Sequence, residues 1–407
     1  MKDENARHLL ATVMGWEEQD IVLRYVPLLG LLADYKYDHY RRFGPGKRFI
    51  ESLALWLSQF IASDRSAALD FVLNRLVFVS DQEISHLVQH AYPDVIVQER
   101  MRMVAEEKGI PSYRVGEISR DLRFKQLQHK SLYLGLSDGA RTDELRRAGS
   151  GEISNEQIWQ AYELGDAKAE DMLDALRKAL STDSPSSARQ VTNEEIWEAC
   201  SAGDRDKADQ LLEALRTESI PPTVPPHTEK FTLVWLLDDF SGSGNTYIRF
   251  DSKAGRFKGK LKKIYDRLNR GDLIDTKHYE VFLLLYIATR QAIDHIEYWS
   301  ERFTSEFGYK PLQVRVLFPI ESDVGLTKEL PAELEAILKN PQYYDPDAFD
   351  QHIAVGGTTD AQMGFAGCAL PLVLSHNTPN NSVYLLWGPE SRKFSGLFPR
   401  VSRHKED

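Results

Sequence analysis

The sequence predicts an α/β fold that is preceded by a helical amino-terminal region and interrupted by a pair of helical hairpins. Apolar residues recur at three- and four-residue spacing through the first ~110 residues, which is typical of amphipathic helices. After residue 131, short apolar runs alternate with helical patterns, as in an α/β sheet. Between the early and later strands, one short pattern occurs twice, at Asn155 and again at Asn193.

The composition is that of a globular chain with more than one structural unit. The chain has 407 residues, of which 42% are hydrophobic and 27% charged, enough for two or three units. Two cysteines are too few for a disulfide framework or a four-cysteine metal site. The net charge of -11 argues against nucleic-acid binding over the whole surface but leaves local basic patches open. Because apolar runs are short and the amino terminus lacks an apolar signal core, we expect a cytoplasmic protein without membrane association.

The helical amino-terminal region is expected over residues 1–130. Helical periodicity runs through Ile21–Leu32, Phe49–Ile61 and Ala67–Val79, and Gly44–Gly46 separates the first two of these helices.

The α/β domain is expected in two pieces, residues 131–150 and 227–407. In the first piece, the strand-like run Ser131–Leu136 leads through a polar loop to the start of a helix at Asp143–Ala148. In the second piece, we expect a helix at Arg290–Phe303. Strands are expected there at Phe231–Leu237, Glu280–Ile287, Leu312–Phe318, Ile353–Val355, Leu370–Leu374 and Val383–Trp387.

Residues 151–226 are expected to form an inserted module. Each copy of the repeat opens with a capping-box pattern, Ser154–Gln157 and Thr192–Glu195, and breaks at a Gly-Asp pair, so that one copy predicts one helical hairpin. The Pro-rich stretch Pro221–Pro226 closes the module as a linker. Two copies fall short of a solenoid, so we expect them to pack together or on the main domain. They are either a docking surface for a partner or a plain insertion.

The stretch Leu233–Thr246 is the most informative motif. An apolar strand ends in two acids, Asp238 and Asp239. Turns of small residues point backbone N–H groups into a concavity that binds phosphate, and paired carboxylates accept hydrogen bonds from vicinal hydroxyls. A ligand with both a phosphate and a vicinal diol is a ribose 5-phosphate, so the motif predicts a site for that group. The alternative is that the motif is a plain turn after a strand, without a ligand. The turn consists of Ser241, Gly242, Ser243, Gly244, Asn245 and Thr246.

Two other phosphate-binding motifs are excluded at this turn. A Walker-type loop requires Gly-Lys-Ser/Thr, and no lysine lies between Asp238 and Thr246. A dinucleotide-binding fingerprint requires a third glycine at the position of Tyr247.

The stretch Val234–Thr246 resembles the phosphoribosyl-pyrophosphate signature of type I phosphoribosyltransferases, in which a hydrophobic strand, two acids and a small-residue loop end in threonine. The resemblance implies a type I phosphoribosyltransferase-like sheet, with Asp238 and Asp239 as catalytic acids facing the ribose hydroxyls and the small-residue loop holding the 5-phosphate. A loop after the earlier strand is similar in position to the pyrophosphate loop of that fold, without its usual pair of small residues. Its residues are Ser137, Asp138, Gly139 and Arg141.

More narrowly, the chain resembles the phosphoribosyltransferase-like family of bacterial conflict systems, which includes retron-associated members, through Leu134–Arg141, Leu237–Thr246 and Leu374–Asn381. This resemblance implies an effector of anti-phage defence. Its partner would be a protein or nucleoprotein, such as a defence complex or a reverse transcriptase with its RNA or DNA, docked through the helical repeats. Magnesium would come with the substrate and need no dedicated metal site.

Three functions stay open because many purine enzymes of this fold carry an acid where Gly242 stands. The chain is expected to be a phosphoribosyltransferase-like glycosyltransferase, in which an acceptor attacks the anomeric carbon and pyrophosphate leaves. One alternative is a toxin that cleaves a nucleotide or an N-glycoside. The other is a non-catalytic sensor of a phosphoribosyl ligand.

Two further segments are candidates for ligand contact. His376, Asn377, Asn380 and Asn381 are expected to form a pocket for the acceptor base, because amides donate and accept hydrogen bonds and a histidine moves protons near neutral pH. The alternative is an Asn-Pro turn between strands. The basic run Lys253–Lys263 could contact pyrophosphate or a nucleic acid, or be a solvated surface. The histidines show no spacing typical of a zinc site.

Overall fold

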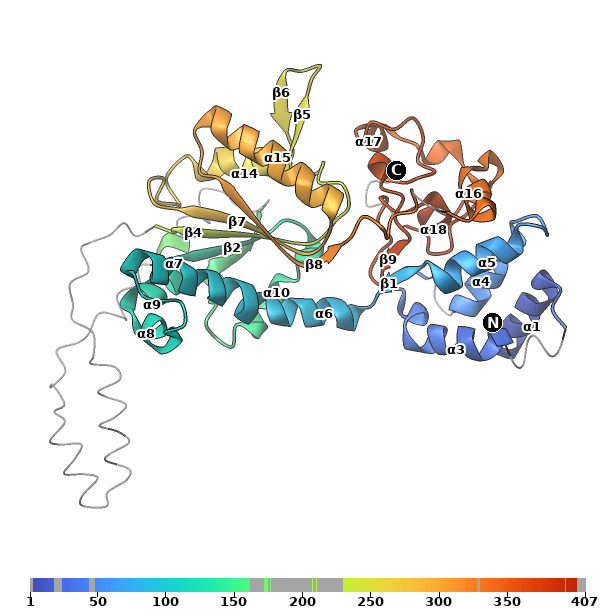
Figure 1. Cartoon of the computed structure of the whole chain (residues 1–407), viewed down its shortest axis with the longest axis horizontal. Helices are drawn as coiled ribbons and strands as arrows, with labels where there is room; N and C mark the ends of the chain where they lie inside the picture. Colours follow the sequence, from blue (N-terminus) through green and yellow to red (C-terminus); the bar gives the residue numbers. More distant parts are fainter. Residues whose placement is uncertain are drawn as a thin grey trace.

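The computed structural model shows the described part of the chain in two lobes (Figure 1). One lobe is built around a parallel sheet, and the other, mainly helical, contains the first and last described segments. Among the described residues, no helix combines the length and apolar character needed to cross a membrane. The described residues are 3–17, 24–43, 48–161, 172–174, 176, 207, 210, 230–327, 330–391 and 393–400.

Within the described residues, the main sheet has five parallel strands in the order β3-β2-β4-β7-β8. This arrangement confirms the predicted α/β fold. In the register, Gly135 of β2 lies beside Leu237 of β4, which in turn pairs with Leu284 of β7. The strands are β2 (Ser131–Gly135), β3 (Ile158–Gln160), β4 (Leu233–Ser241), β7 (Glu280–Thr289) and β8 (Leu312–Ile320).

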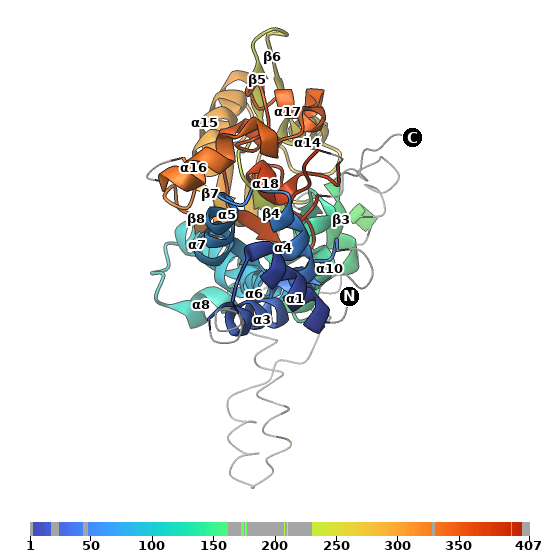
Figure 2. The same ribbon diagram turned by 90° about the vertical axis from the view of Figure 1, so that its right-hand side faces the viewer.

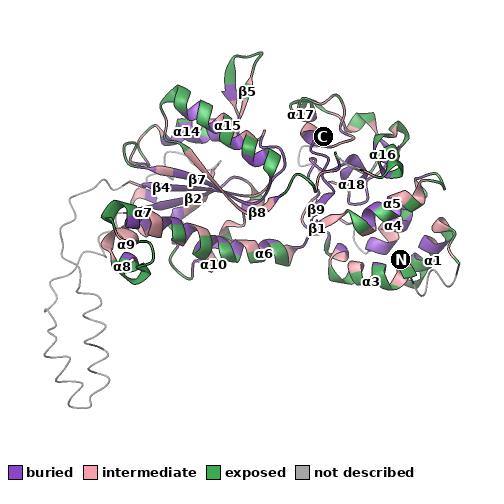
Figure 3. Ribbon diagram, in the orientation of Figure 1, coloured by how far each residue is buried: buried purple, intermediate pink, exposed green. Residues whose placement is uncertain are grey.

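Helices cover both faces of this sheet, which explains why its strands appear in the sequence as continuous apolar runs. Because side chains alternate along a strand, Leu236 packs towards one layer of helices and Trp235 towards the other. Figure 3 shows the strands buried between these layers. One layer contains α14 (Lys260–Leu268) and α15 (Arg290–Phe307). The other contains α6 (Asp81–His90), the π-helical turn Ala91–Val97, α7 (Gln98–Lys108), α8 (Val115–Arg120), α9 (Leu122–His129) and α10 (Thr142–Ala148).

The helical lobe is assembled from both ends of the chain, as Figure 2 shows from the end of the molecule. Trp56 is buried in its core, and its indole N–H donates to the carbonyl of Leu385 at 3.0 Å. The parallel pairing of β1 (Val77–Val79) with β9 (Leu372–Leu374) joins the two ends near the sheet lobe. The helices are α1 (Asp3–Met14), α3 (Val26–Tyr35), α4 (Phe49–Ser58), α5 (Arg65–Asn74), α16 (Ala332–Lys339), α17 (Gln351–Ala354) and α18 (Tyr384–Trp387).

Two of the expected strands are wrong. Ile353–Val355 lies at the end of α17, which Asp350 caps by accepting from the backbone N–H of Ile353 at 2.7 Å, and Val383–Trp387 lies largely in α18. A short buried apolar run does not distinguish a strand from a helical turn, and tertiary packing decided both cases. The expected strand at Leu370–Leu374 is confirmed as β9.

The first copy of the repeat begins differently from the expected helix. The capping box at Ser154 is present, but it leads into a single 3-10 turn, Asn155–Gln157, and then into β3, the edge strand of the main sheet. Met172 and Leu176 are buried in the core on the α14 and α15 side of the sheet. Most of the remaining repeat, its second copy and the Pro-rich linker lie outside the described residues.

Candidate functional site

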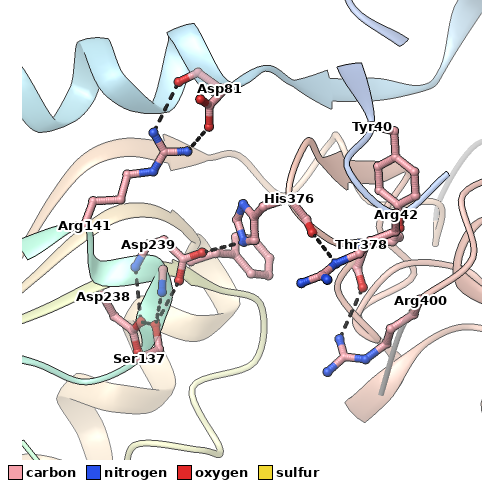
Figure 4. Close-up of polar contacts among 12 residues, drawn as sticks. Tyr40, Arg42, Asp81, Ser137, Arg141, Asp238, Asp239, His376, Thr378 and Arg400 are labelled. Atoms are coloured by element: carbon pink, nitrogen blue, oxygen red, sulfur yellow. Dashed lines mark hydrogen bonds and ion pairs between the residues drawn. The ribbon is translucent and has the colours of Figure 1, made fainter. Parts of the chain in front are cut away.

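The candidate site lies at the carboxyl ends of β2 and β4, where ligands bind in α/β sheets (Figure 4). Because β2 and β4 are parallel neighbours, the loop after β2 and the acids of β4 meet at one edge of the sheet. The backbone N–H of Leu136 extends this pairing by donating to the carbonyl of Leu237 at 2.8 Å. Ser137 is therefore placed beside Asp238 although the two are far apart in the sequence.

Asp238 and Asp239 fall within the last residues of β4, so the alternation of the strand directs them to opposite faces of the sheet. Asp238 faces the side of α14 and meets Tyr247 and Lys260. Asp239 faces the other side and meets His376. The two acids therefore have different surroundings despite being adjacent.

Three side chains of the protein donate hydrogen bonds to the carboxylate of Asp238. Ser137 Oγ donates to its Oδ1, while Tyr247 OH at 2.7 Å and Lys260 Nζ at 3.2 Å both donate to its Oδ2. The side chain is only 4% exposed. Burial raises the pKa of Asp238, and the positive charge of Lys260 opposes that rise.

Asp239 is the more accessible acid, with a side chain that is 13% exposed. Its Oδ2 lies 3.0 Å from Nε2 of His376. Burial raises the pKa of Asp239, but the hydrogen bond and charge of His376 outweigh burial and hold the pKa below its ordinary value. Gly139 lies directly against this carboxylate, because a Cβ at that position would be 2.4 Å from Asp239 Cγ.

The small-residue loop after β4 presents a run of backbone N–H groups at the end of that strand. Among the described residues, the N–H groups of Ser243, Gly244, Asn245 and Thr246 have no hydrogen-bond partner. Gly244 has φ +76°, a conformation that favours glycine, and a Cβ there would lie 2.9 Å from the carbonyl of Ala292. Runs of backbone N–H groups in turns of this kind bind anions in many proteins.

The carboxyl-terminal segment covers part of this loop. A Cβ on Gly242 would lie 2.4 Å from Cγ of Asn381, whose amide donates to Cys368 Sγ and to the carbonyl of Phe365. The carbonyl of Gly242 accepts from Thr289 Oγ1 at 2.6 Å. The loop is thus fixed from β7 on one side and from the carboxyl-terminal segment on the other.

Of the residues expected to form the acceptor pocket, His376 and Asn381 contact the acids and the loop. The backbone N–H of Asn377 donates to the carbonyl of Leu374, and the carbonyl of Asn380 accepts from the N–H of Phe365. These two backbone contacts hold the turn around His376.

The side chain of Arg141 is directed away from the acids. The guanidinium of Arg141 pairs with Asp81 of α6 and with Glu144, and Figure 4 shows it turned from Asp238 and Asp239 towards α6. Its φ of +47° is unusual for a residue other than glycine. Asp138 is exposed at the tip of the loop. In this arrangement the expected pyrophosphate loop contributes Ser137 and Gly139 to the site.

A hairpin explains how Lys260 reaches the site. The antiparallel strands β5 (Arg249–Asp251) and β6 (Arg256–Lys258) follow the small-residue loop and bring the chain back beside it. The hairpin closes because the N–H of Lys260 donates to the carbonyl of Thr246 at 3.1 Å. Gly259 makes the closure possible, since its φ is +126° and a Cβ would lie 2.3 Å from the carbonyl of Tyr247. α14 therefore starts beside the loop.

Sequence reasoning missed several residues of this site. Lys260 belongs to the basic run Lys253–Lys263, so the pattern pointed to the segment without selecting the residue. Tyr247 was only the residue that broke the dinucleotide fingerprint. No local signal marks Thr289 or Cys368, which reach Gly242 from distant parts of the chain.

The parallel sheet covered by helices is consistent with a phosphoribosyltransferase-like α/β fold. A family model described as PRTase-CE matches residues 53–400, which include the whole main sheet and the site. The chain therefore belongs to the PRTase-CE family. Comparison with curated proteins and with solved structures gave no match.

Proposed function

We propose that this protein binds phosphoribosyl pyrophosphate or a nucleotide at the carboxyl ends of β2 and β4. The observation that carries the proposal is the position of the Asp238–Asp239 pair beside the unpaired N–H groups of residues 243–246. Backbone N–H groups suit a 5-phosphate, and a carboxylate suits the vicinal hydroxyls of ribose. A single ligand that carries a 5-phosphate and a ribose diol would bind the loop N–H groups and the carboxylates at the same time.

The two acids take different parts in this proposal. Asp239 accepts the ribose hydroxyls directly, because within the described part of the chain His376 is the partner of its Oδ2 and part of the side chain is exposed. Asp238 is fixed by Ser137, Tyr247 and Lys260 and orders the end of β4. As the bond at the anomeric carbon breaks, positive charge on the sugar would be stabilised by these nearby carboxylates.

Magnesium would enter with the substrate in this proposal. Mg²⁺ is typically bound by substrate phosphates and one or two carboxylates and keeps several waters. Asp239 fits this role as a partly exposed carboxylate. The ion would neutralise the pyrophosphate as it leaves.

A non-catalytic sensor is the second candidate, and Gly242 favours it. The space in which a side chain at position 242 would project is filled by Asn381. An acid at that position, which would act as a base, therefore has no room without a shift of the carboxyl-terminal segment. A sensor would bind the same ligand without turnover.

The ligand is tested by calorimetry with phosphoribosyl pyrophosphate, ribose 5-phosphate and a nucleoside 5-monophosphate, each with Mg²⁺. Gly244→Ala is expected to abolish binding, because the new Cβ meets the carbonyl of Ala292 and distorts the loop. Gly255→Ala is the matched control, since Gly255 also has a positive φ but no atom within 4 Å of a new Cβ. Equal binding by both variants would refute the assignment. Phosphorus NMR with added bases or nucleotides then separates transfer, cleavage and binding without turnover.

The cellular part of the proposal is an effector of bacterial anti-phage defence with a protein or nucleoprotein partner. It is supported by membership of the PRTase-CE family and by the resemblance of three segments to conflict-system proteins. The proposed docking surface, the helical repeats, lies mostly outside the described residues. Phage challenge of cells that express the wild type or Asp239→Asn tests it, and equal plaque counts with and without the wild-type protein would contradict it.

A further inference from the structure

We infer that Lys260 is the cation that binds the pyrophosphate group of the ligand. This inference rests on the proposed function and adds a role that neither the motif nor the expected pyrophosphate loop assigns. Lys260 Nζ lies 2.9 Å from the carbonyl of Leu136, at the end of β2, and 3.2 Å from Asp238 Oδ2, near the end of β4. The ammonium group therefore bridges the two strand ends that form the site.

The position of Lys260 matches the place where the sugar and its leaving group would meet. The loop after β4 would hold the 5-phosphate and Asp239 the ribose hydroxyls, so the remaining side of the sugar faces the loop after β2. Leu136 immediately precedes that loop. The ammonium group of Lys260 thus contacts both Asp238 and the residue just before the expected pyrophosphate loop.

Three cations of the neighbouring segments are paired with acids elsewhere. Arg141, which belongs to the expected pyrophosphate loop, is paired with Asp81 and Glu144. Within the basic run, Lys258 pairs with Asp251 and Lys262 with Asp266. Among the described contacts, Lys260 is the residue of this run that reaches the acids.

Lys260 is also ordered before a ligand arrives. An ammonium group has three N–H donors, and two of them have partners in Leu136 and Asp238. Nζ also lies over the Tyr247 ring, 5.5 Å from its centre, within range of a cation–π interaction. The side chain is 33% exposed, so that the third N–H is available to a ligand.

The proposed role of Lys260 in the reaction is to stabilise the negative charge that develops on the leaving pyrophosphate. When the acceptor forms its bond to the anomeric carbon, the bond to the pyrophosphate oxygen breaks and its electron pair stays on pyrophosphate. A hydrogen bond from Lys260 to that oxygen becomes stronger as negative charge develops there, and Lys260 keeps its own proton.

The test compares two ligands that differ only by the pyrophosphate group. Calorimetry measures phosphoribosyl pyrophosphate and ribose 5-phosphate, at one Mg²⁺ concentration, with the wild type, Lys260→Met, Lys260→Arg and the control Lys262→Met. We expect Lys260→Met to lower affinity for phosphoribosyl pyrophosphate by about tenfold or more, as for a lost charge-assisted hydrogen bond. Affinity for ribose 5-phosphate should stay within about threefold. Lys260→Arg should recover part of the loss, and Lys262→Met should bind both ligands as the wild type does.

A second variant covers the case in which Lys260→Met misfolds. Removing the lysine alone leaves a buried carboxylate without its counter-charge and without a donor, whereas Lys260→Gln keeps an N–H donor beside Asp238 and removes only the charge. The same selective loss is expected in this second variant. Equal losses for both ligands would overturn the inference and show that Lys260 only positions Asp238. Failure of the wild type to bind either ligand would instead refute the proposed function itself.

Discussion

Nε2 of His376 lies 3.0 Å from Oδ2 of Asp239, and this pair joins the two lobes at the candidate site. Asp239 belongs to the main sheet, whereas the carbonyl of His376 accepts from Nε of Arg42 at 2.9 Å, near the start of the chain. Asn381, a few residues further on, packs on Gly242 of the small-residue loop. A ligand that displaces His376 from Asp239 would therefore break this contact between the two lobes.

The first prediction concerns the pH dependence of this pair. A carboxyl group whose folded pKa is lowered contributes stability that is present above its ordinary pKa of about 4 and is lost as the pH falls through the folded value. We expect His376→Gln to lower the free energy of unfolding by about 1–2 kcal/mol at pH 5. The difference from the wild type should shrink as the pH is lowered below the ordinary range of Asp.

Urea unfolding at several pH values measures this effect. The matched control is His278→Gln, because His278 pairs with Asp275 at 3.3 Å but has a side chain that is 78% exposed. An exposed pair contributes little, so the control should change stability less at every pH. A His376→Gln difference that is independent of pH would show that the pair with Asp239 is not its source.

The second prediction separates the two acids. Asp239→Asn should weaken ligand binding strongly and cost about as much stability as His376→Gln, because both variants break the same pair. Asp238→Asn should lower the free energy of unfolding by about 1–3 kcal/mol, since an amide nitrogen would replace an oxygen that accepts from donors on every side. Calorimetry with ligand and thermal melting without it distinguish the two variants. Identical behaviour would contradict the division of roles.

The third prediction uses the close contact at Gly139. In Gly139→Ala, the new Cβ would lie 2.4 Å from Asp239 Cγ, so the carboxylate or the loop must shift. We expect a loss of stability of about 1–3 kcal/mol and weaker ligand binding. Gly116→Ala is the control, because the nearest atom to its Cβ is the end of the Arg120 side chain at 3.9 Å. The control should be neutral or slightly stabilising, as for alanine in a helix.

The fourth prediction concerns the boundary of the inserted module. Replacing Glu152–Ile220 with a Gly/Ser linker should lower the melting temperature or make the protein insoluble. The deletion removes β3 and Gln157, whose amide donates to the carbonyls of Gln128 and Ser131. It also removes Glu152, the carboxylate partner of the buried Arg100, at a cost of about 3 kcal/mol or more.

A shorter deletion provides the comparison for this boundary. Removing residues 181–220 leaves β3, Gln157 and the buried Leu176 in place, so the melting temperature should stay closer to that of the wild type. Equal melting temperatures for the two deletions would show that residues 152–180 contribute nothing to the sheet lobe.

Local sequence was sufficient for the elements that carry the site. β2, β4, β7, β8 and α15 were all predicted, because continuous apolar runs and helical periodicity are properties of a few consecutive residues. The order of acids and small residues was likewise visible in the chain before any fold was known. The failures at α17 and α18 were short apolar runs, in which the two periodicities cannot be distinguished.

Contacts between distant residues were decided by the tertiary structure alone. Closure of the β5–β6 hairpin brings Lys260 to Asp238, and the pairing of β1 with β9 brings the ends of the chain together near His376. Arg141 is drawn towards Asp81 of α6, a partner that its own loop does not reveal. Because backbone preferences are local, most strands and helices and the small-residue turn could be predicted from the sequence, whereas α17, α18 and β3 could not. Which side chains meet at that turn depends on packing between segments that are far apart in the chain, and no local pattern encodes it.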